Sequence, residues 1–517
     1  MAGDAVIHDH DIIGGEKAEV EYLEDSGSPS RQPLQITQLT EHERAIERKL
    51  RIKMDCLIMP IVVLVYLMNY IDRNNYAAAK LQGLVEDLHL SAEQYQVGLS
   101  ILFVAYVLMQ VPSNLMLNYC GRPSWYIGFF VIAWGLVSAV TSQVKDYGGI
   151  VACRFILGLV EAPFFPGILF YLSKWYTKEE LSFRMAVFYS GSLISGAFGN
   201  LIAAGILRGL NGTRGMDPWQ WLYIIEGSLT VFIGLIIVFV MPDFPDTWRR
   251  LSAEEKHVAN RRLAIDAAEA DVDLPGGMSQ WTGCKLCFKD PNTYILAIAY
   301  HAIVGGSGFQ NFFPSLTATL GYDYIISLLL VAPPYVFLVI YSYGNSWLSD
   351  KLQNRFWFFV YPIPITIIGF VVFMFTDDFG PKYFSLFLMN LIFAQNGIFY
   401  AWIANAIPRP PAKRAAAMAF INSIGNCASI WTPFTYINPP HYRPALGICI
   451  GLQVVAFVCA IIIRITMQRK NKHLAALQNE DVALSEKDLT KLRKTAEMEG
   501  IDIATARRQA KDYRYVI

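Results

Sequence analysis

Residues 56–76 read CLIMPIVVLVYLMNYIDRNNY, and no charged residue occurs in this stretch before Asp72 and Arg73. The hydrocarbon core of a bilayer is about 30 Å thick, and an α-helix needs about 20 mostly apolar residues to cross it. The stretch therefore predicts a membrane-spanning helix. Asp72 and Arg73, in its outer part, become candidate functional residues, because inserting a charged side chain into a span costs about 2.5–3.5 kcal/mol.

Comparable apolar runs recur along the chain. They lie at 94–117, 125–143, 149–173, 185–207, 219–241, 293–315, 325–348, 356–376, 382–406, 415–437 and 444–466. In lipid only helices and closed barrels satisfy their backbone hydrogen bonds, and these runs are about twice as long as barrel strands. The sequence predicts an all-α membrane protein of twelve spans, arranged as two six-helix halves.

The polar segments between and around these runs set the domain boundaries. We expect an N-terminal tail over 1–55, a first bundle over 56–241, a linker over 242–292, a second bundle over 293–466 and a C-terminal tail over 467–517. The sequence Thr40-Glu41-His42-Glu43 has the form of a capping box, which predicts that a helix begins there. Ser252 and Glu255 predict the start of an amphipathic helix over 252–270 in the linker.

Basic residues are unevenly distributed between the two sets of loops, which predicts the orientation. One set is rich in Lys and Arg, namely Arg122, Lys174, Lys178, Arg184, Lys351, Arg355, Arg409, Lys413 and Arg414. The opposite set has fewer, namely Lys80, Lys145, Arg208, Arg214, Lys382 and Arg443. We therefore expect both termini and the linker in the cytosol. The glycosylation sequon at Asn211 falls on the other side, in agreement.

Composition excludes several classes of function. The chain has 517 residues, 54% of them hydrophobic, with 43 basic and 43 acidic residues, so nothing indicates a nucleic-acid partner. Cys284 and Cys287 form a CxxC without a second pair, so no metal site is expected. No P-loop, HExxH or nucleophile elbow occurs, which argues against an enzyme. We expect a monomer without cofactors that draws its energy from an ion gradient, with protons as the coupling ion.

The plan of two six-helix halves around a long linker resembles the major facilitator superfamily. That superfamily carries a Gly/Asp/basic signature after its second and eighth spans. Here the second copy reads LSDKLQNR at 348–355, and the first reads NYCGRP at 118–123 and lacks the Asp. By this resemblance Asp350, Lys351, Arg355 and Arg122 belong to the loops that gate the transporter.

A finer resemblance is to the anion:cation symporter family, the fungal branch with allantoate, nicotinate, pantothenate and biotin permeases. The residues that carry it are Arg48-Lys49, Asp55, Pro60, Tyr66-Leu67 and YIDRNN at 70–75; Tyr106, Gln110 and VPSNL at 111–115; Arg154-Phe155, Gly158, Glu161, Pro163 and Pro166-Gly167; Trp402, Asn405, Lys413-Arg414, Asn422, Gly425-Asn426 and Trp431; and YRYVI at 513–517. The resemblance implies a proton symporter of the plasma membrane that imports a small carboxylate.

Two other functions remain open at this stage. One is an exporter of a metabolite or xenobiotic, and the other is a nutrient receptor that uses a transporter fold. Drug:proton antiporters of the superfamily carry a Gly-Pro motif in the fifth span, and the fifth span here has no proline. This absence favours import.

Arg154 and Glu161 are the ionisable residues of the fourth span. They are seven residues apart, which places them two turns apart on one face of the helix. We expect both at a cavity between the halves, where Glu161 takes up and releases a proton and Arg154 favours its ionised form. The alternative is a buried ion pair that only fixes helix packing.

Asp72 and Arg73 are adjacent, so they point about 100° apart around a straight helix and cannot serve one point together. The functional interpretation gives the carboxylate of the substrate to Arg73, whose planar fork matches it, and makes Asp72 a second proton carrier. Relatives among bacterial and vesicular organic-anion carriers imply the same roles. The alternative is a cap at the outer end of the span, with Arg73 extended to the interface.

His301 of the seventh span could also transfer protons, or it could be a hydrogen-bonded core residue. The remaining candidates are polar residues in otherwise apolar spans, which we expect to bind the substrate by hydrogen bonds or to join helices. They are Tyr70, Tyr106, Gln110, Asn405, Asn422 and Asn426.

Overall fold

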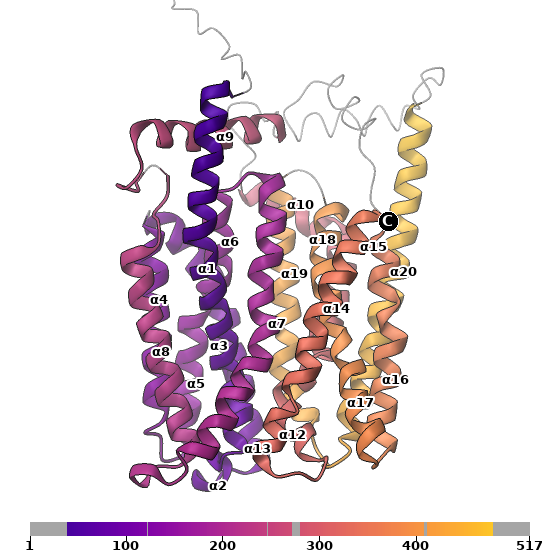
Figure 1. The fold of residues 1–517 in the computed structure, drawn as a ribbon. Coiled ribbons are helices and arrows are strands. Elements are labelled where there is room, and N and C mark those ends of the chain that lie inside the picture. The colour runs from indigo at the N-terminus through magenta and orange to yellow at the C-terminus, as the bar shows by residue number, and fades with distance from the viewer. Residues whose placement is uncertain (1–38, 121, 246, 271–279, 408–410, 479–517) are drawn as a thin grey trace, which may run out of the picture. The chain divides into compact units, whose positions relative to one another are not determined.

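The computed structural model describes residues 39–120, 122–245, 247–270, 280–407 and 411–478. Every regular element in these ranges is a helix, which confirms the all-α prediction. Figure 1 shows long helices running side by side, with α2, α12 and α13 at one end and α9 and α10 at the other. We call these the α2 end and the α9 end.

The first half comprises α1 to α8. Its elements are α1 (Glu41–Lys80), α2 (Leu84–Asp87), α3 (Ala92–Cys120), α4 (Pro123–Thr141), α5 (Tyr147–Glu161), α6 (Phe164–Ser173), α7 (Lys178–Gly209), η1 (Thr213–Gly215) and α8 (Pro218–Val240). The predicted capping box is present at the start of α1, where Glu43 N donates to Thr40 Oγ1 at 3.3 Å. The helix that begins there continues without a break into the first span.

The linker and the second half follow. Their elements are α9 (Ala253–Ala270), α10 (Gln280–Lys289), α11 (Pro291–Gly306), η2 (Gly308–Phe312), α12 (Phe313–Ala318), α13 (Tyr324–Leu329), α14 (Ala332–Lys351), α15 (Arg355–Val360), α16 (Pro362–Phe375), α17 (Phe379–Asn390), η3 (Leu391–Phe393), α18 (Ala394–Ala406), α19 (Pro411–Trp431), η4 (Thr432–Thr435) and α20 (Arg443–Gln478). Reciprocal hydrogen bonds between Ser252 and Glu255 start α9, as predicted for the amphipathic helix.

Ten helical segments in the described ranges are long and apolar enough to cross a membrane. The other two predicted spans are helical but fall short for identifiable reasons. In the span at 293–315 the 16-residue α11 gives way to η2, and the span at 415–437 coincides with α19, which carries Asn422 and Asn426 among its apolar residues. Helices α11 and α19 pack against each other within the second bundle.

Close packing of α4 against α8 positions several of the polar side chains described below. A Cβ atom at Gly227 of α8 would lie 2.5 Å from the backbone nitrogen of Ala139, and one at Gly135 of α4 would lie 2.8 Å from that of Val231. Only glycine fits at such contacts, and small residues at helix interfaces let backbones approach closely in membranes. The two helices therefore meet backbone to backbone over about one turn.

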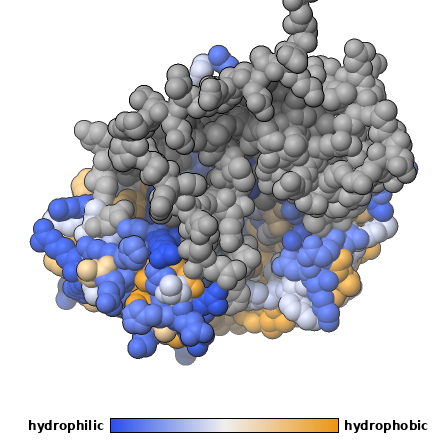
Figure 2. All heavy atoms as spheres, turned by 90° about the horizontal axis from the view of Figure 1, so that it is seen from above, coloured by the Kyte–Doolittle hydropathy of each residue, from blue (hydrophilic) through white to orange (hydrophobic). Residues whose placement is uncertain are grey.

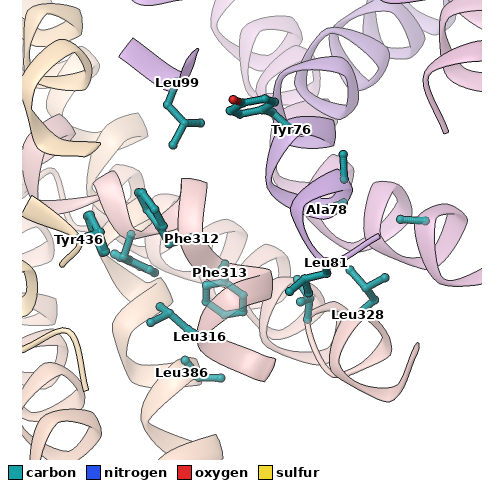
Figure 3. Packing of buried hydrophobic residues seen from close by; sticks show 14 of the residues in the cluster. Tyr76, Ala78, Leu81, Leu99, Phe312, Phe313, Leu316, Leu328, Leu386 and Tyr436 are labelled. Carbon is teal, nitrogen blue, oxygen red and sulfur yellow. The ribbon is translucent and has the colours of Figure 1, made fainter. Parts of the chain in front are cut away.

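Three hydrophobic clusters show how the halves are joined. One cluster, at the α2 end, contains residues from both halves, and we call it the shared cluster. Figure 3 shows Tyr76 and Leu99 of the first half close to Phe312 and Tyr436 of the second. The rings of Tyr95 and Phe312 meet edge to face at 6.3 Å, and Gln96 Nε2 donates to Tyr436 O at 3.4 Å.

The other two clusters each belong to one side of the molecule. One runs from Leu50 to Ala259 and the other from Cys287 to Met467. Apolar packing thus joins the two halves at the α2 end, whereas toward the α9 end each side has a separate apolar cluster. Viewed from the α9 end, the visible residues at the margins are largely hydrophilic (Figure 2).

Helix α9 is attached to the first half by charged contacts. Arg261 Nη1 lies 2.7 Å from Glu43 Oε1, and Arg262 Nη1 lies 3.3 Å from Glu180 Oε2. Lys53 Nζ lies 3.1 Å from Glu255 Oε1. Burial tends to raise the pKa of Glu255, but hydrogen bonds from Ser252 and Lys53 outweigh it and hold the pKa below its ordinary value. Several ion pairs therefore anchor the linker helix to the first half.

Candidate transport site

An ion pair between α1 and α5 forms the centre of the candidate site. Arg73 Nε donates to Glu161 Oε2 at 2.6 Å. The Glu161 side chain is fully buried, whereas that of Arg73 is 15% exposed. The guanidinium lies over the ring of Tyr106 at 4.5 Å and near that of Tyr70 at 5.6 Å. A partly accessible cation held between a carboxylate and two aromatic faces can recognise an anion.

This pairing corrects an expectation from the sequence, because Glu161 is hydrogen-bonded to Arg73 rather than paired with Arg154. Arg73, expected to bind the carboxylate of a substrate, is paired with a carboxylate of the protein in this structure. Glu161 is the last residue of α5, and a short turn at Ala162 and Pro163 separates it from α6. Arg154, two turns earlier, instead donates through Nε to Gly98 O at 3.2 Å and stacks on Tyr76 at 4.7 Å.

Asp72 points away from Arg73, as the 100° rule requires. Its carboxylate is fully buried between α1, α4 and α8 and accepts hydrogen bonds from Trp134 Nε1 at 3.2 Å, Ser138 Oγ at 3.1 Å and Thr230 Oγ1 at 2.9 Å. The interpretation of Asp72-Arg73 as a cap at the end of the span is wrong, because α1 continues to Lys80 and both side chains bind inside the first half.

A chain of tyrosine rings crosses from the first half to the second. Tyr66 stands between Tyr70 and Tyr189, with ring centroids 5.1 and 6.2 Å away. Tyr189 of α7 stacks on Tyr400 of α18 at 6.0 Å. The Tyr400 hydroxyl is 2.7 Å from that of Tyr300. It also donates to Asn422 Oδ1 at 2.9 Å, which places Asn422 in this network.

Tyr189, Tyr300 and Tyr400 were not among the residues predicted from the sequence. Their signal was available, since a tyrosine in an apolar span brings a hydroxyl that needs a partner. Glu226 of α8 was also missed, although a glutamate in the predicted span at 219–241 is the same kind of signal as Glu161.

His301 forms two hydrogen bonds that join α11 to α19. Trp431 Nε1 donates to His301 Nε2 at 3.2 Å, so Nε2 accepts. Nδ1 lies 2.8 Å from Ile424 O and must therefore be the protonated nitrogen. A neutral imidazole with both nitrogens engaged supports the alternative of a hydrogen-bonded core residue.

The other predicted residues lie as follows. Gln110, Asn405 and Asn426 are on α3, α18 and α19, and their contact with a substrate stays a prediction. Arg355 Nη1 forms an ion pair with Asp350 and lies 3.2 Å from Ser349 Oγ. Lys351 Nζ lies 4.9 Å from the Trp347 ring. Arg122 and Asn211 are exposed.

The described residues hold no cluster of three or more His, Cys, Asp or Glu side chains that could bind a metal ion. Two bundles of long apolar helices, with a buried ion pair inside the first, are typical of membrane transporters. The family model of the Major Facilitator Superfamily matches residues 62–433. The chain belongs to this superfamily, which consists of transporters rather than enzymes.

Relatives and solved structures agree with this assignment. The chain is 34% identical over 466 residues to the "MFS-type transporter cnsO" of Penicillium expansum, covering 86% of this chain and 88% of the relative. It is 28% identical to the "Major facilitator-type transporter hxnP" of Emericella nidulans, covering 90% and 95%. Its fold is similar to that of a bacterial homologue of the lysosomal transporter Spinster, in an inward-facing and occupied conformation, with a TM-score of 0.59, 15% identity, and coverage of 80% and 96%.

Proposed function

We propose that this transporter imports a small organic anion together with protons. The observation that carries the proposal is the Arg73–Glu161 pair, in which one guanidinium faces both a buried carboxylate and the rings of Tyr70 and Tyr106. An incoming carboxylate competes with Glu161 for Arg73. When Glu161 takes up a proton it no longer balances the charge of Arg73, and the guanidinium becomes available to the substrate. Anion binding and proton binding thereby favour each other.

The substrate class follows from the groups around Arg73. A planar guanidinium matches a carboxylate with two parallel hydrogen bonds, and the tyrosine rings suit a small, partly apolar acid. The resemblance to nicotinate, pantothenate and allantoate permeases points to the same class. The hydroxyl groups of Tyr300 and Tyr400 and the amide of Asn422 supply hydrogen bonds from the second half.

The function is tested by uptake into yeast cells that lack their own acid permeases. Cells that express the chain should accumulate at least one labelled acid from the set of nicotinate, pantothenate and allantoate. Uptake should rise as the external pH falls and stop when a protonophore collapses the gradient. Uptake that is independent of external pH and of the protonophore would contradict proton coupling. Faster loss of preloaded acid from cells that express the chain than from cells that do not would favour the exporter.

We further propose that the α9 end faces the cytosol, as the basic loops predict, in the plasma membrane. The division of apolar packing toward the α9 end then corresponds to an inward-facing conformation. In a variant whose other cysteines are replaced by serine, an impermeant thiol reagent should label Cys284 of α10 only after permeabilisation. The exposed position of Asn211, changed to cysteine in the same background, should be labelled on intact cells. The reverse pattern would invert the orientation.

A further inference from the structure

Glu226 is a buried acid that the site described above does not use. It lies on α8 with 1% of its surface exposed. Neither carboxyl oxygen has a hydrogen-bond partner in the part of the chain that the structure describes. The side chain of Asn75 lies close enough to interact with Glu226, but its amide nitrogen also has no partner within hydrogen-bond distance. An ionised carboxylate in such surroundings costs several kcal/mol, which a bound proton removes.

The location of Asp72 strengthens this argument. Glu226 and Thr230 are four residues apart on one face of α8, and the Thr230 hydroxyl donates to Asp72. Two carboxyl groups thus share the interface of α1 and α8, and Asp72 acts electrostatically on Glu226. Asp72 receives three hydrogen bonds and Glu226 receives none. This asymmetry places the negative charge on Asp72 and the proton on Glu226.

The elements packed against Glu226 supply few other ionisable groups. Tyr223 lies one turn earlier on α8, and Arg154 of α5 acts on Tyr223 while stacking on Tyr76 of α1. The interface with α4 contributes the neutral Trp134 and Ser138, and α7 adds the apolar residues Ala203, Ala204 and Ile206 to the shared cluster. Tyr76 Oη, Tyr223 Oη and Arg154 Nη1 also lack partners among the described residues. Buried polar groups therefore extend from Glu226 to the shared cluster.

We infer that Glu226 is a second proton-carrying carboxyl group of the transport cycle, distinct from Glu161 and remote from the substrate. The inference rests on the proposed proton-coupled function. Tyr76 and Tyr223 belong to the shared cluster, so opening of the α2 end, which faces outward in the proposed orientation, admits external water beside Glu226. The carboxylate takes up a proton from this water, and closure of the cluster expels the water and keeps the acid protonated. In the inward-facing state the O–H bond breaks, and the proton passes to water that enters from the α9 end.

Infrared spectroscopy of the purified full-length protein in lipid tests the inference without any substrate. A protonated carboxyl group has a carbonyl band that an ionised one lacks. The wild-type protein should show this band at neutral pH, and Glu226→Gln, which nearly keeps the shape of the protonated acid, should remove it. Glu93→Gln, at an exposed acid that begins α3, is the matched control and should leave the band unchanged. An intact band in Glu226→Gln would overturn the inference.

A second variant and a second measurement keep the test decisive. Glu226→Met has a similar volume without polar atoms and gives the same readout if the Gln variant fails to fold. In proteoliposomes, Glu226→Gln should lower the number of protons moved per anion by one while the affinity for the anion stays the same. An unchanged proton ratio would also overturn the inference. If no anion is transported by the wild-type protein, the proposed function fails, but the infrared band still reports on Glu226.

Discussion

Arg73→Lys should raise the apparent KM for the transported anion roughly 10–150-fold. Lysine keeps the positive charge but loses the planar fork, and one charge-assisted hydrogen bond is worth about 1.5–3 kcal/mol. The shorter reach of an ammonium group also weakens its hold on Glu161, now 2.6 Å from Arg73 Nε. Initial rates of labelled anion uptake across a range of concentrations measure the change.

The control for this prediction is Arg208→Lys, at an exposed position in the last turn of α7, which should leave KM unchanged. Arg73→Ala should go further and abolish saturable uptake, since it removes the cation and leaves Glu161 as a buried acid without its partner. If Arg73→Ala transports the same acid with the affinity of the wild-type protein, Arg73 does not bind the anion.

Apolar run length was enough to predict the architecture. Bilayer thickness and the need to satisfy backbone hydrogen bonds in lipid predicted the twelve runs and the linker between them. Capping residues predicted the helix starts at Thr40 and Ser252. The interruption of the seventh span at η2 was less accessible. Residues 308–312 of η2 contact η4 and α20, and periodicity does not report such contacts.

The candidate site was predictable as a set of residues but not as a set of partners. Arg73, Asp72 and Glu161 stood out because charge is rare in apolar spans. Spacing on one helix suggested that Glu161 pairs with Arg154, yet the bond that forms joins α5 to α1, 88 positions away in the chain. Which pairs of a buried set form is decided by helix packing and by the break at Pro163. Sequence spacing within one helix predicts neither how the helices pack nor the effect of that break.

The hydrogen-bond partners of Asp72 could not be predicted from the sequence either. Its position in the outer part of the first span was predicted from the sequence, and so was its 100° separation from Arg73 around the helix. Its three donors come from α4 and α8, which approach closely because Gly135 and Gly227 leave room. A glycine in an apolar run does not reveal which helix it will meet, so the burial of Asp72 followed only from the structure.

The second large effect is expected for Glu161→Gln. Glutamine fills nearly the same volume as glutamate and can still accept a hydrogen bond from Arg73, but it cannot take up or release a proton. The variant should therefore lose uphill, pH-driven uptake. It should retain counterflow, in which labelled and unlabelled anion exchange without net proton movement. Uptake driven by an imposed pH gradient and exchange without one, measured on the same proteoliposomes, separate the two activities.

Energetics explain why this loss should be large. A monoanion that enters with two protons carries one net positive charge, worth about 2.3 kcal/mol at a potential of 100 mV, or roughly 50-fold accumulation before any pH gradient is added. Glutamine leaves the charge of Arg73 unbalanced whether or not protons are bound, so the anion can cross without protons and accumulation should fall to equilibration even though Glu226 is intact. Glu86→Gln, at an exposed acid of α2, is the matched control and should concentrate the anion normally. If Glu161→Gln still concentrates substrate with its pH dependence intact, Glu161 only holds Arg73 in place, and the coupling proton belongs to Glu226. If neutralising Asp72, Glu161 and Glu226 together leaves accumulation unchanged, the transporter does not use protons.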